Sequence, residues 1–301
     1  YYCGNMFPCR SRPADGTRFE LALSGVPAGD TAVFPATIGT DSAAYQLAWV
    51  VGPYQRTSLG TTTAGTEIVV WNHANEMVNA IQGTRHLRAG FEWMEQNLGP
   101  YRFGTVAGSV SAHWGGGAYG GMEHHPLWHV ASDAMGDESV HMHEAAHGWF
   151  GDGVRLACWE DFVLSEGAAS YYEARLVEEV GDPGAGDAAW AAYESELARF
   201  NSPGGGNGIA WPQTCDAIDV LDIFTRAPYV KGALFLRAVE RKIGRPMFDL
   251  AMRRFYQAHD GEASGVVALV AMFQEVSGYD ASACAQTWLA ERPVPTEMTC
   301  P

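Results

Sequence analysis

The feature that most constrains this chain is a short run of two histidines and a glutamate, His143-Glu144-Ala145-Ala146-His147. Residues four apart lie on the same face of an α-helix, so one helix can direct both imidazoles toward a single ion. The run has the HExxH pattern, in which the histidines bind zinc and the glutamate is the general base of a metallopeptidase. Val140 and Phe150 extend the same stripe. The sequence therefore predicts a metal-binding helix over residues 137–150.

A catalytic zinc ion needs a third protein ligand and an open position for water. Glu166 can supply that ligand, because it lies on the next predicted helix, over residues 162–180. Glu173 is on the same helical face as Glu166, where it can accept a hydrogen bond from the free ring nitrogen of a zinc-bound histidine. A surface position for Glu173 is equally open. We expect one Zn2+ ion per chain, held by His143, His147 and Glu166, with Glu144 taking the proton of the attacking water.

Further motifs around this site occur together in one known family. The segments HEAAHGWFGD (143–152) and LSEGAASYYE (164–173), with Trp159 and Asp161 between them, resemble the M1 family of zinc aminopeptidases, the gluzincins. Gly120-Gly121-Met122-Glu123-His124 resembles the family's GxMEN strand, and residues 229–236 resemble its YxKG helix. The motifs follow one another in the family's order, and a weaker likeness extends over the rest of residues 1 to about 292.

The resemblance implies an α+β fold, a thermolysin-like zinc peptidase catalytic domain with a mixed sheet lobe and a helical lobe, preceded by a short all-β segment. On this basis residues 1–70 are a partial or reduced amino-terminal β domain, and residues 71–301 form the catalytic domain. No room remains for the carboxy-terminal helical domain of the family. The implied enzyme is a zinc metallopeptidase.

The resemblance also implies roles for residues outside the metal ligands. Tyr229 matches the tyrosine of YxKG, whose phenol can donate to the oxyanion of the tetrahedral intermediate. Without the resemblance it would be an ordinary aromatic residue at a helix start. Glu123 matches the carboxylate that binds the α-ammonium group of the substrate. The expected partner is therefore a peptide with a free amino terminus.

Other residues have supporting roles in the same comparison. The strand that carries Glu123 supplies Gly120, Gly121 and Met122 for substrate binding, and Asp161 is expected to support the zinc ligands together with Glu173. His124 departs from the family pattern, because it stands where the family has asparagine. The geometry of amine recognition therefore depends on a residue that the resemblance does not supply.

Two other functions fit the same residues. A thermolysin-type endopeptidase would share the metal chemistry and differ in the role of Glu123. A non-catalytic binding module would keep zinc for structure alone. Structural zinc sites normally close the fourth position with protein, whereas these residues supply three ligands and a base. We therefore rank the aminopeptidase first and the binding module last.

Hydrophobic patterns predict the elements around the site. Short β-rich runs predict strands at residues 19–23, 45–51 and 67–71, and further strands are expected at 102–111 and 122–130. One helix is predicted over residues 75–98, ended by Gly99-Pro100. Later helical patterns cover residues 137–150, 162–180, 228–243, 246–258, 264–276 and 281–290. Residues 181–212 are expected to be a long connection with one short helix at 188–200.

The side chains near the motif are assigned by type. We expect Trp149, Phe150, Leu156 and Phe162 to pack in the core, since apolar residues at helical spacing usually do. We expect four histidines to lie at the surface or behind the ligands, namely His124, His125, His129 and His141.

Composition excludes two classes of partner. The formal net charge of −16 argues against binding to a nucleic-acid backbone. No run of about 18 apolar residues is present that could span a membrane. The sequence does not predict the oligomeric state.

Six cysteines without the paired short spacing of a zinc ribbon favour disulfides. An oxidising compartment follows, either extracellular or periplasmic. Cys3 with Cys9 and Cys284 with Cys300 are candidate local pairs, and a Cys158–Cys215 pair would tie the segment before Glu166 to a later loop. Other connectivities, and buried free thiols, remain open.

Overall fold

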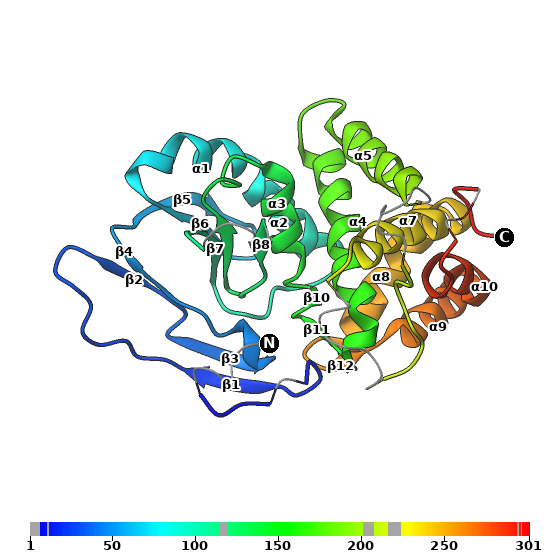
Figure 1. The fold of residues 1–301 in the computed structure, drawn as a ribbon, viewed down its shortest axis with the longest axis horizontal. Helices are drawn as coiled ribbons and strands as arrows, with labels where there is room; N and C mark the ends of the chain where they lie inside the picture. Colours follow the sequence, from blue (N-terminus) through cyan, green and yellow to red (C-terminus); the bar gives the residue numbers. More distant parts are fainter. Residues whose placement is uncertain are drawn as a thin grey trace.

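A computed structural model of the chain describes residues 7–10, 12–114, 120–200, 208–215, 224–293, 295 and 297–301. A sheet lobe and a helical lobe lie side by side, and the amino-terminal strands run along the lower edge of the sheet lobe (Figure 1). The predicted α+β architecture is therefore confirmed. No helix in the described part of the chain is long and apolar enough to cross a membrane.

The amino-terminal segment forms two small antiparallel sheets. One pairs β1 (Thr17–Glu20) with β3 (Thr37–Ser42), and the other pairs β2 (Thr31–Val33) with β4 (Val50–Gly52). The strand predicted at 45–51 is wrong for its first half, where residues 44–46 form a 3-10 helix. The side chain of Gln46 caps that turn, because its Oε1 accepts a hydrogen bond from the backbone N–H of Ala43 at 2.8 Å.

The central sheet has five strands in the order β5-β6-β7-β9-β8. The strands are β5 (Gln55–Thr61), β6 (Glu67–Asn72), β7 (Val106–Ala112), β8 (Gly121–Met122) and β9 (Leu127–Ala131). β6, β7 and β9 run parallel, and both edge strands are antiparallel to their neighbours. The boundary expected between residues 70 and 71 falls inside β6, and the sheet begins with β5. The division of the chain into an amino-terminal segment and a catalytic domain stays a prediction.

The strand predicted at 122–130 is divided in two. A turn at residues 123–126 reverses the chain, so that β9 runs back along β8, and β8 forms the edge of the sheet. Pro126 stands in this turn, and a proline has no N–H to donate to a strand ladder. The turn leaves Glu123 directly after β8, at the end of an edge strand.

Three helices pack against the sheet: α1 (Met77–Gly83), α2 (Leu87–Asn97) and α3 (Glu138–Ala146). The single helix predicted over 75–98 is interrupted, because the Thr84 hydroxyl donates to the Ala80 carbonyl at 2.6 Å where α1 ends. α3 begins at an N-cap, where the Asp137 carboxylate accepts the Ser139 N–H at 3.0 Å. It ends earlier than the predicted 150, before Gly148.

The helical lobe holds the other α-helices of the described residues. They are α4 (Phe162–Val180), α5 (Ala185–Arg199), α7 (Arg226–Ile243), α8 (Arg245–His259), α9 (Val266–Ser277), α10 (Ser282–Ala285) and a π-helical turn (Gln286–Ala290). A small parallel sheet of β10 (Phe150–Gly151), β11 (Val154–Leu156) and β12 (Ala263–Ser264) joins the lobes. The predicted helix 162–180 agrees with α4. The predicted helix 281–290 is divided between α10 and the π-helical turn.

α4 and α7 approach each other through two glycines. A Cβ at Gly167 would lie 2.7 Å from Gly232 Cα, and a Cβ at Gly232 would lie 2.7 Å from Val163 Cγ2. Real Cβ atoms do not come so close to their neighbours, so the two helices could not pack at this distance with larger residues. Because Glu166 precedes Gly167 and Tyr229 is on α7, this contact sets how far apart they lie.

Lys231 on α7 is fully buried, although lysine rarely is. Its Nζ donates to three backbone carbonyls, those of Gly208 at 3.0 Å, Glu291 at 2.8 Å and Arg292 at 3.0 Å. All three donors of the ammonium group are therefore used, and α7 is tied to the segment that follows the π-helical turn.

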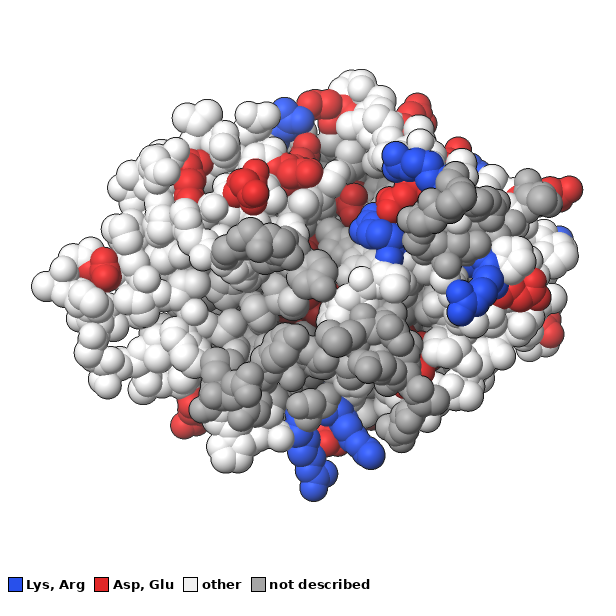
Figure 2. Space-filling model, viewed as in Figure 1, with Lys and Arg blue, Asp and Glu red and all other residues white. Residues whose placement is uncertain are grey.

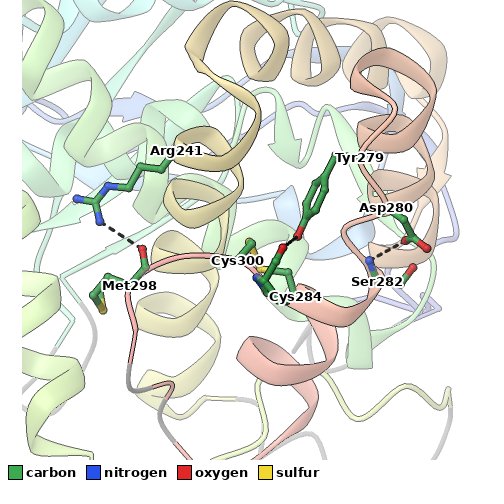
Figure 3. Close-up of a disulfide and its surroundings, with 8 residues drawn as sticks. Arg241, Tyr279, Asp280, Ser282, Cys284, Met298 and Cys300 are labelled. Carbon is green, nitrogen blue, oxygen red and sulfur yellow. Dashed lines mark hydrogen bonds between the residues drawn. A yellow bond between two sulfur atoms is a disulfide. The ribbon is translucent and has the colours of Figure 1, made fainter.

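Two disulfides join described residues, and both were among the expected pairs. Cys158 bonds Cys215, and Cys284 bonds Cys300. Figure 3 shows the second bond, which holds the end of the chain against α10, with the Tyr279 hydroxyl donating to the Pro301 carbonyl at 3.1 Å. The expected Cys3–Cys9 pair involves Cys3, which lies outside the described residues.

Candidate active site

A cavity of about 430 Å³ lies between the sheet lobe and the helical lobe. It is lined by residues from β8, α3, α4, α5 and α7. In the space-filling view the surface is hollowed between the lobes, with charged side chains at the edge of the hollow (Figure 2). Of the residues predicted from the sequence, ten line it: Gly120, Gly121, Met122, Glu123, His143, Glu144, His147, Glu166, Glu173 and Tyr229.

The candidate zinc ligands converge in this cavity. One ligand atom from each of His143, His147 and Glu166 lies within 4.8 Å of the others. Glu166 Oε2 is 3.1 Å from His143 Nε2 and 3.5 Å from His147 Nε2. Two imidazole nitrogens and one carboxylate oxygen at such separations suit a zinc ion.

The other ring nitrogen of each histidine is held in place. The Nδ1–H of His147 donates to the Phe150 carbonyl at 3.0 Å, and the Nδ1–H of His143 donates to Glu173 Oε2 at 3.2 Å. The Tyr193 hydroxyl on α5 donates to the same carboxylate oxygen at 2.8 Å. Such partners fix the orientation of each ring, so that each Nε2 faces the cavity and can bind a metal ion once it has lost its proton. Glu173 thus lies where the sequence led us to expect it.

Charges are strongly coupled among these groups. Burial lowers the pKa of both imidazoles, but Glu166 outweighs burial, so the pKa of His147 rises to about 9 and that of His143 lies well above its usual value. Burial raises the pKa of Glu166, but the two histidines outweigh it and lower the pKa to about 2. A divalent cation that binds here would displace protons from the imidazoles. The donor set therefore fits zinc.

Glu144 lies beside the candidate zinc ligands but does not belong to the group formed by His143, His147 and Glu166. Only 5% of the residue is exposed, and its Oε2 has no hydrogen-bond partner among the described residues. Burial is the largest cause that raises the pKa of Glu144, to about 8. A buried carboxylate with an unused oxygen next to two zinc-ligand candidates is suited to accept a proton from water.

Gly121 on β8 leaves the space that Glu144 occupies. A Cβ at Gly121 would lie 2.6 Å from Glu144 Cγ, whereas a Cβ at the neighbouring Gly120 would meet only Val140 at 3.4 Å. We expect Gly121→Ala to displace the Glu144 carboxylate and to reduce kcat by about 10²-fold, the effect of misplacing a catalytic group by about 1 Å. Steady-state kinetics with metal analysis would measure it. Gly120→Ala adds the same methyl group to the same strand without reaching Glu144, so it should lower kcat less, and equal losses in both variants would contradict the expectation.

Glu123 lies beside Glu144 and His147, and Tyr229 lies beside His143. Ligand atoms of Glu123, Glu144 and His147 are within 4.8 Å of one another. The Tyr229 ring stacks at 6.0 Å on that of His143, and the Arg226 guanidinium lies 5.0 Å from the centre of the Tyr229 ring. Burial, followed by the carboxylates of Glu166 and Glu123, raises the pKa of Tyr229 well above its usual value. Its phenol is therefore protonated at neutral pH and can donate a hydrogen bond.

Asp161 lies away from the ligands. Its Oδ1 accepts the Val266 N–H at 3.0 Å, at the beginning of α9. Gly265 makes room for this contact, because a Cβ there would lie 2.9 Å from Asp161 Cγ. Asp161 therefore holds the start of α9, and its support of the zinc ligands stays a prediction.

The histidines near the motif are more buried than predicted. His125, His129 and His141 are buried, so a surface position is wrong for them. The Nε2–H of His125 donates to the Glu144 carbonyl, and its Nδ1 accepts from the Tyr101 hydroxyl, both at 2.8 Å. Burial lowers the pKa of His125 to about 3, so the ring is neutral and holds the α3 backbone. The four apolar residues assigned to the core, Trp149, Phe150, Leu156 and Phe162, are all buried.

The residues of the cavity wall that sequence reasoning missed include Tyr45, Tyr193 and Arg226. The Tyr45 hydroxyl donates to Asp152 Oδ1 at 3.1 Å, a contact between distant parts of the sequence that no local pattern indicates. Arg226 precedes Tyr229 by three residues on one helix, so helical spacing could have paired them.

The fold and the site together define a metallopeptidase. A sequence model of the peptidase family M1 domain matches residues 123–288, and the chain belongs to peptidase family M1. The chain is 27% identical over 247 residues to leucine aminopeptidase 2 of Lodderomyces elongisporus (71% of this chain and 36% of the relative). It is 31% identical over 197 residues to leucine aminopeptidase 2 of Candida albicans (58% and 29%). The chain thus spans about a third of these relatives.

Solved structures resemble the chain in fold. An M1 zinc metallopeptidase from Deinococcus radiodurans bound to a Tyr-Ser-Ala substrate superposes with a TM-score of 0.73 at 24% identity, covering 89% of this chain and 63% of the other. Native leukotriene A4 hydrolase from Saccharomyces cerevisiae superposes with a TM-score of 0.80 at 20% identity, covering 98% and 49%.

Proposed function

We propose that this chain is an aminopeptidase, which removes amino-terminal residues from peptides with one zinc ion held by His143, His147 and Glu166. The observation that carries the proposal is the position of Glu123. This buried carboxylate lies in the same cavity as the ligand candidates, with an oxygen within 4.8 Å of both Glu144 and His147. A carboxylate in this place can bind an ammonium group by charge-assisted hydrogen bonds.

The position of the cut follows from covalent geometry. The α-nitrogen of a residue is joined to its carbonyl carbon through two bonds of about 1.5 Å each. A substrate whose α-ammonium binds Glu123 therefore brings its first peptide bond to Glu144, while later bonds lie beyond reach. The names of the two leucine aminopeptidase relatives, and the tripeptide bound by the Deinococcus radiodurans enzyme, support this reading.

The residues divide the reaction between them. Zinc bound at this site would act as a Lewis acid on the scissile carbonyl and make water acidic enough to attack near neutral pH. Glu144 accepts the proton as the water oxygen bonds to the carbonyl carbon, and passes it to the nitrogen as the C–N bond breaks. The phenol of Tyr229 donates to the negatively charged oxygen.

Replacing Glu123 by glutamine tests amine recognition. We expect kcat/KM for aminoacyl reporters to fall at least about tenfold, because a hydrogen bond to a charged group is lost. Zinc content should not change. Glu196→Gln is the matched control, because Glu196 lines the same cavity but is paired with Arg226 at 2.8 Å.

Blocked substrates separate the aminopeptidase from a thermolysin-type endopeptidase. The wild-type protein should hydrolyse amino-terminally acetylated peptides much more slowly than free ones. Equal rates on both, together with an unimpaired Glu123→Gln variant, would favour the endopeptidase.

We also propose that the protein works in an oxidising compartment, extracellular or periplasmic. Two disulfides among the described residues support this location, since such bonds persist mainly outside the reducing cytosol.

A further inference from the structure

A second group of metal-binding side chains lies at the edge of the central sheet. His73 directly follows β6, and His113 directly follows β7. These strands are parallel neighbours, with Trp71 opposite Val110, so their carboxyl ends meet at one edge. Glu76 belongs to the 3-10 helix Ala74–Glu76 that begins immediately after His73. The topology therefore brings His113 to His73 and Glu76, although His113 lies 40 residues after His73 in the sequence.

The ligand atoms of this group converge as closely as those of the active site. One atom from each of His73, Glu76 and His113 lies within 4.8 Å of the others. Glu76 Oε1 is 2.7 Å from His113 Nε2 and 4.0 Å from His73 Nδ1. The two imidazole rings stack with their centres 4.7 Å apart. None of the three lines the active-site cavity within the described part of the chain.

Only one of the two carboxylate oxygens of Glu76 accepts a hydrogen bond from the described residues. The residue is 6% exposed, and Oε2 accepts the backbone N–H of His73 at 2.9 Å. Oε1 has no hydrogen-bond partner among the described residues, because the nearby His113 nitrogen does not meet the geometry of a hydrogen bond. A buried carboxylate oxygen without a partner is unfavourable. A cation held between Oε1 and the imidazoles would satisfy it.

An ordinary ion pair in the same protein has a different geometry. His86 Nδ1 and Glu138 Oε1 are 2.6 Å apart and do form a hydrogen bond, and no second imidazole among the described residues completes a ligand group there. In the His73 group two imidazoles face one buried oxygen instead. The side chain of His113 is 50% exposed, which gives an ion access from solvent.

We propose that His73, Glu76 and His113 bind a second divalent transition-metal ion, distinct from the catalytic zinc. Two imidazole nitrogens and a carboxylate oxygen suit Zn2+, Cu2+ or Ni2+ better than Mg2+ or Ca2+, which prefer oxygen ligands. Three protein ligands leave at least one coordination position for water. The site does not depend on the proposed peptidase activity.

Zinc titration of the intact protein, already loaded with one zinc ion, tests this site. Calorimetry should detect one further Zn2+ in the wild type. His113→Ala should lower the affinity for this second ion at least about tenfold, since removing a metal ligand costs more affinity than removing a residue that only supports a ligand. His86→Ala is the matched control and should keep it. His113→Asn replaces the alanine variant if that variant fails to retain the first zinc.

A spectroscopic measurement identifies the ligands. Cu2+ added to the zinc-loaded protein should give an electron paramagnetic resonance signal with coupling to two imidazole nitrogens, and one nitrogen fewer in His113→Ala. Absence of a second binding event in the wild type, or equal affinity in His113→Ala, would overturn the proposal and leave His113 and Glu76 as an ion pair only.

Discussion

Replacing Glu144 by glutamine should lower kcat by about 10²- to 10⁴-fold, the contribution typical of a positioned general base. Glutamine keeps the shape of the side chain but cannot accept the water proton. Because the zinc-ligand candidates are His143, His147 and Glu166, the variant should retain its metal. Steady-state kinetics on an aminoacyl reporter, with metal analysis of the same sample, would measure both quantities.

A control on the same helix separates catalysis from folding. Glu138 begins α3 and pairs with His86 and Arg85 outside the cavity. Glu138→Gln removes the same charge and should leave kcat nearly unchanged. If Glu144→Gln turned over substrate at the wild-type rate with zinc bound, another group would have to be the base.

Replacing Glu166 by glutamine should cost the protein its zinc and its activity together. Mutating residues that only support zinc ligands lowers metal affinity by about 10- to 100-fold. We therefore expect removal of a ligand itself to lower zinc affinity by more than about 100-fold. The carboxylate also contacts both imidazoles, since its Oε2 is 3.1 Å from His143 Nε2 and 3.5 Å from His147 Nε2. Metal analysis after dialysis against a weak chelator would measure the loss, and activity should return only at high added zinc.

Glu179→Gln provides the comparison on α4. Glu179 pairs with Arg175 at 2.9 Å and with Arg245 at 3.5 Å, away from the cavity. Its loss should leave zinc content at the wild-type value. A Glu166→Gln protein that kept one tightly bound zinc ion would show that the third ligand is a different residue.

The parts of the site that could be predicted from the sequence involve residues only a few positions apart along the chain. The two histidines are four residues apart, and Glu166 and Glu173 share one face of a helix whose limits, 162–180, agree with the structure. Helical periodicity is a local property, so it can be read without knowing the fold. The resemblance to a known family then supplied Glu123 and Tyr229, which no spacing connects to the motif.

The parts that could not be predicted depend on contacts across the fold. Tyr45 reaches the cavity wall through Asp152, and Asp161 turns away to the start of α9. The division of residues 122–130 into two strands depends on a turn that ends β8 beside α3. Burial of His125, His129 and His141 likewise depends on packing between elements. Local patterns carry no information on such neighbours.

The contact between Gly167 and Gly232 means that the spacing of catalytic groups is controlled by residues that take no part in the chemistry. A methyl group added at either glycine would push α4 and α7 apart and move the Tyr229 phenol away from Glu166. Such a variant would keep every reactive side chain and still be a poor enzyme. Screens for inactive variants of this protein should therefore recover changes at these two positions as well as changes that remove a functional group.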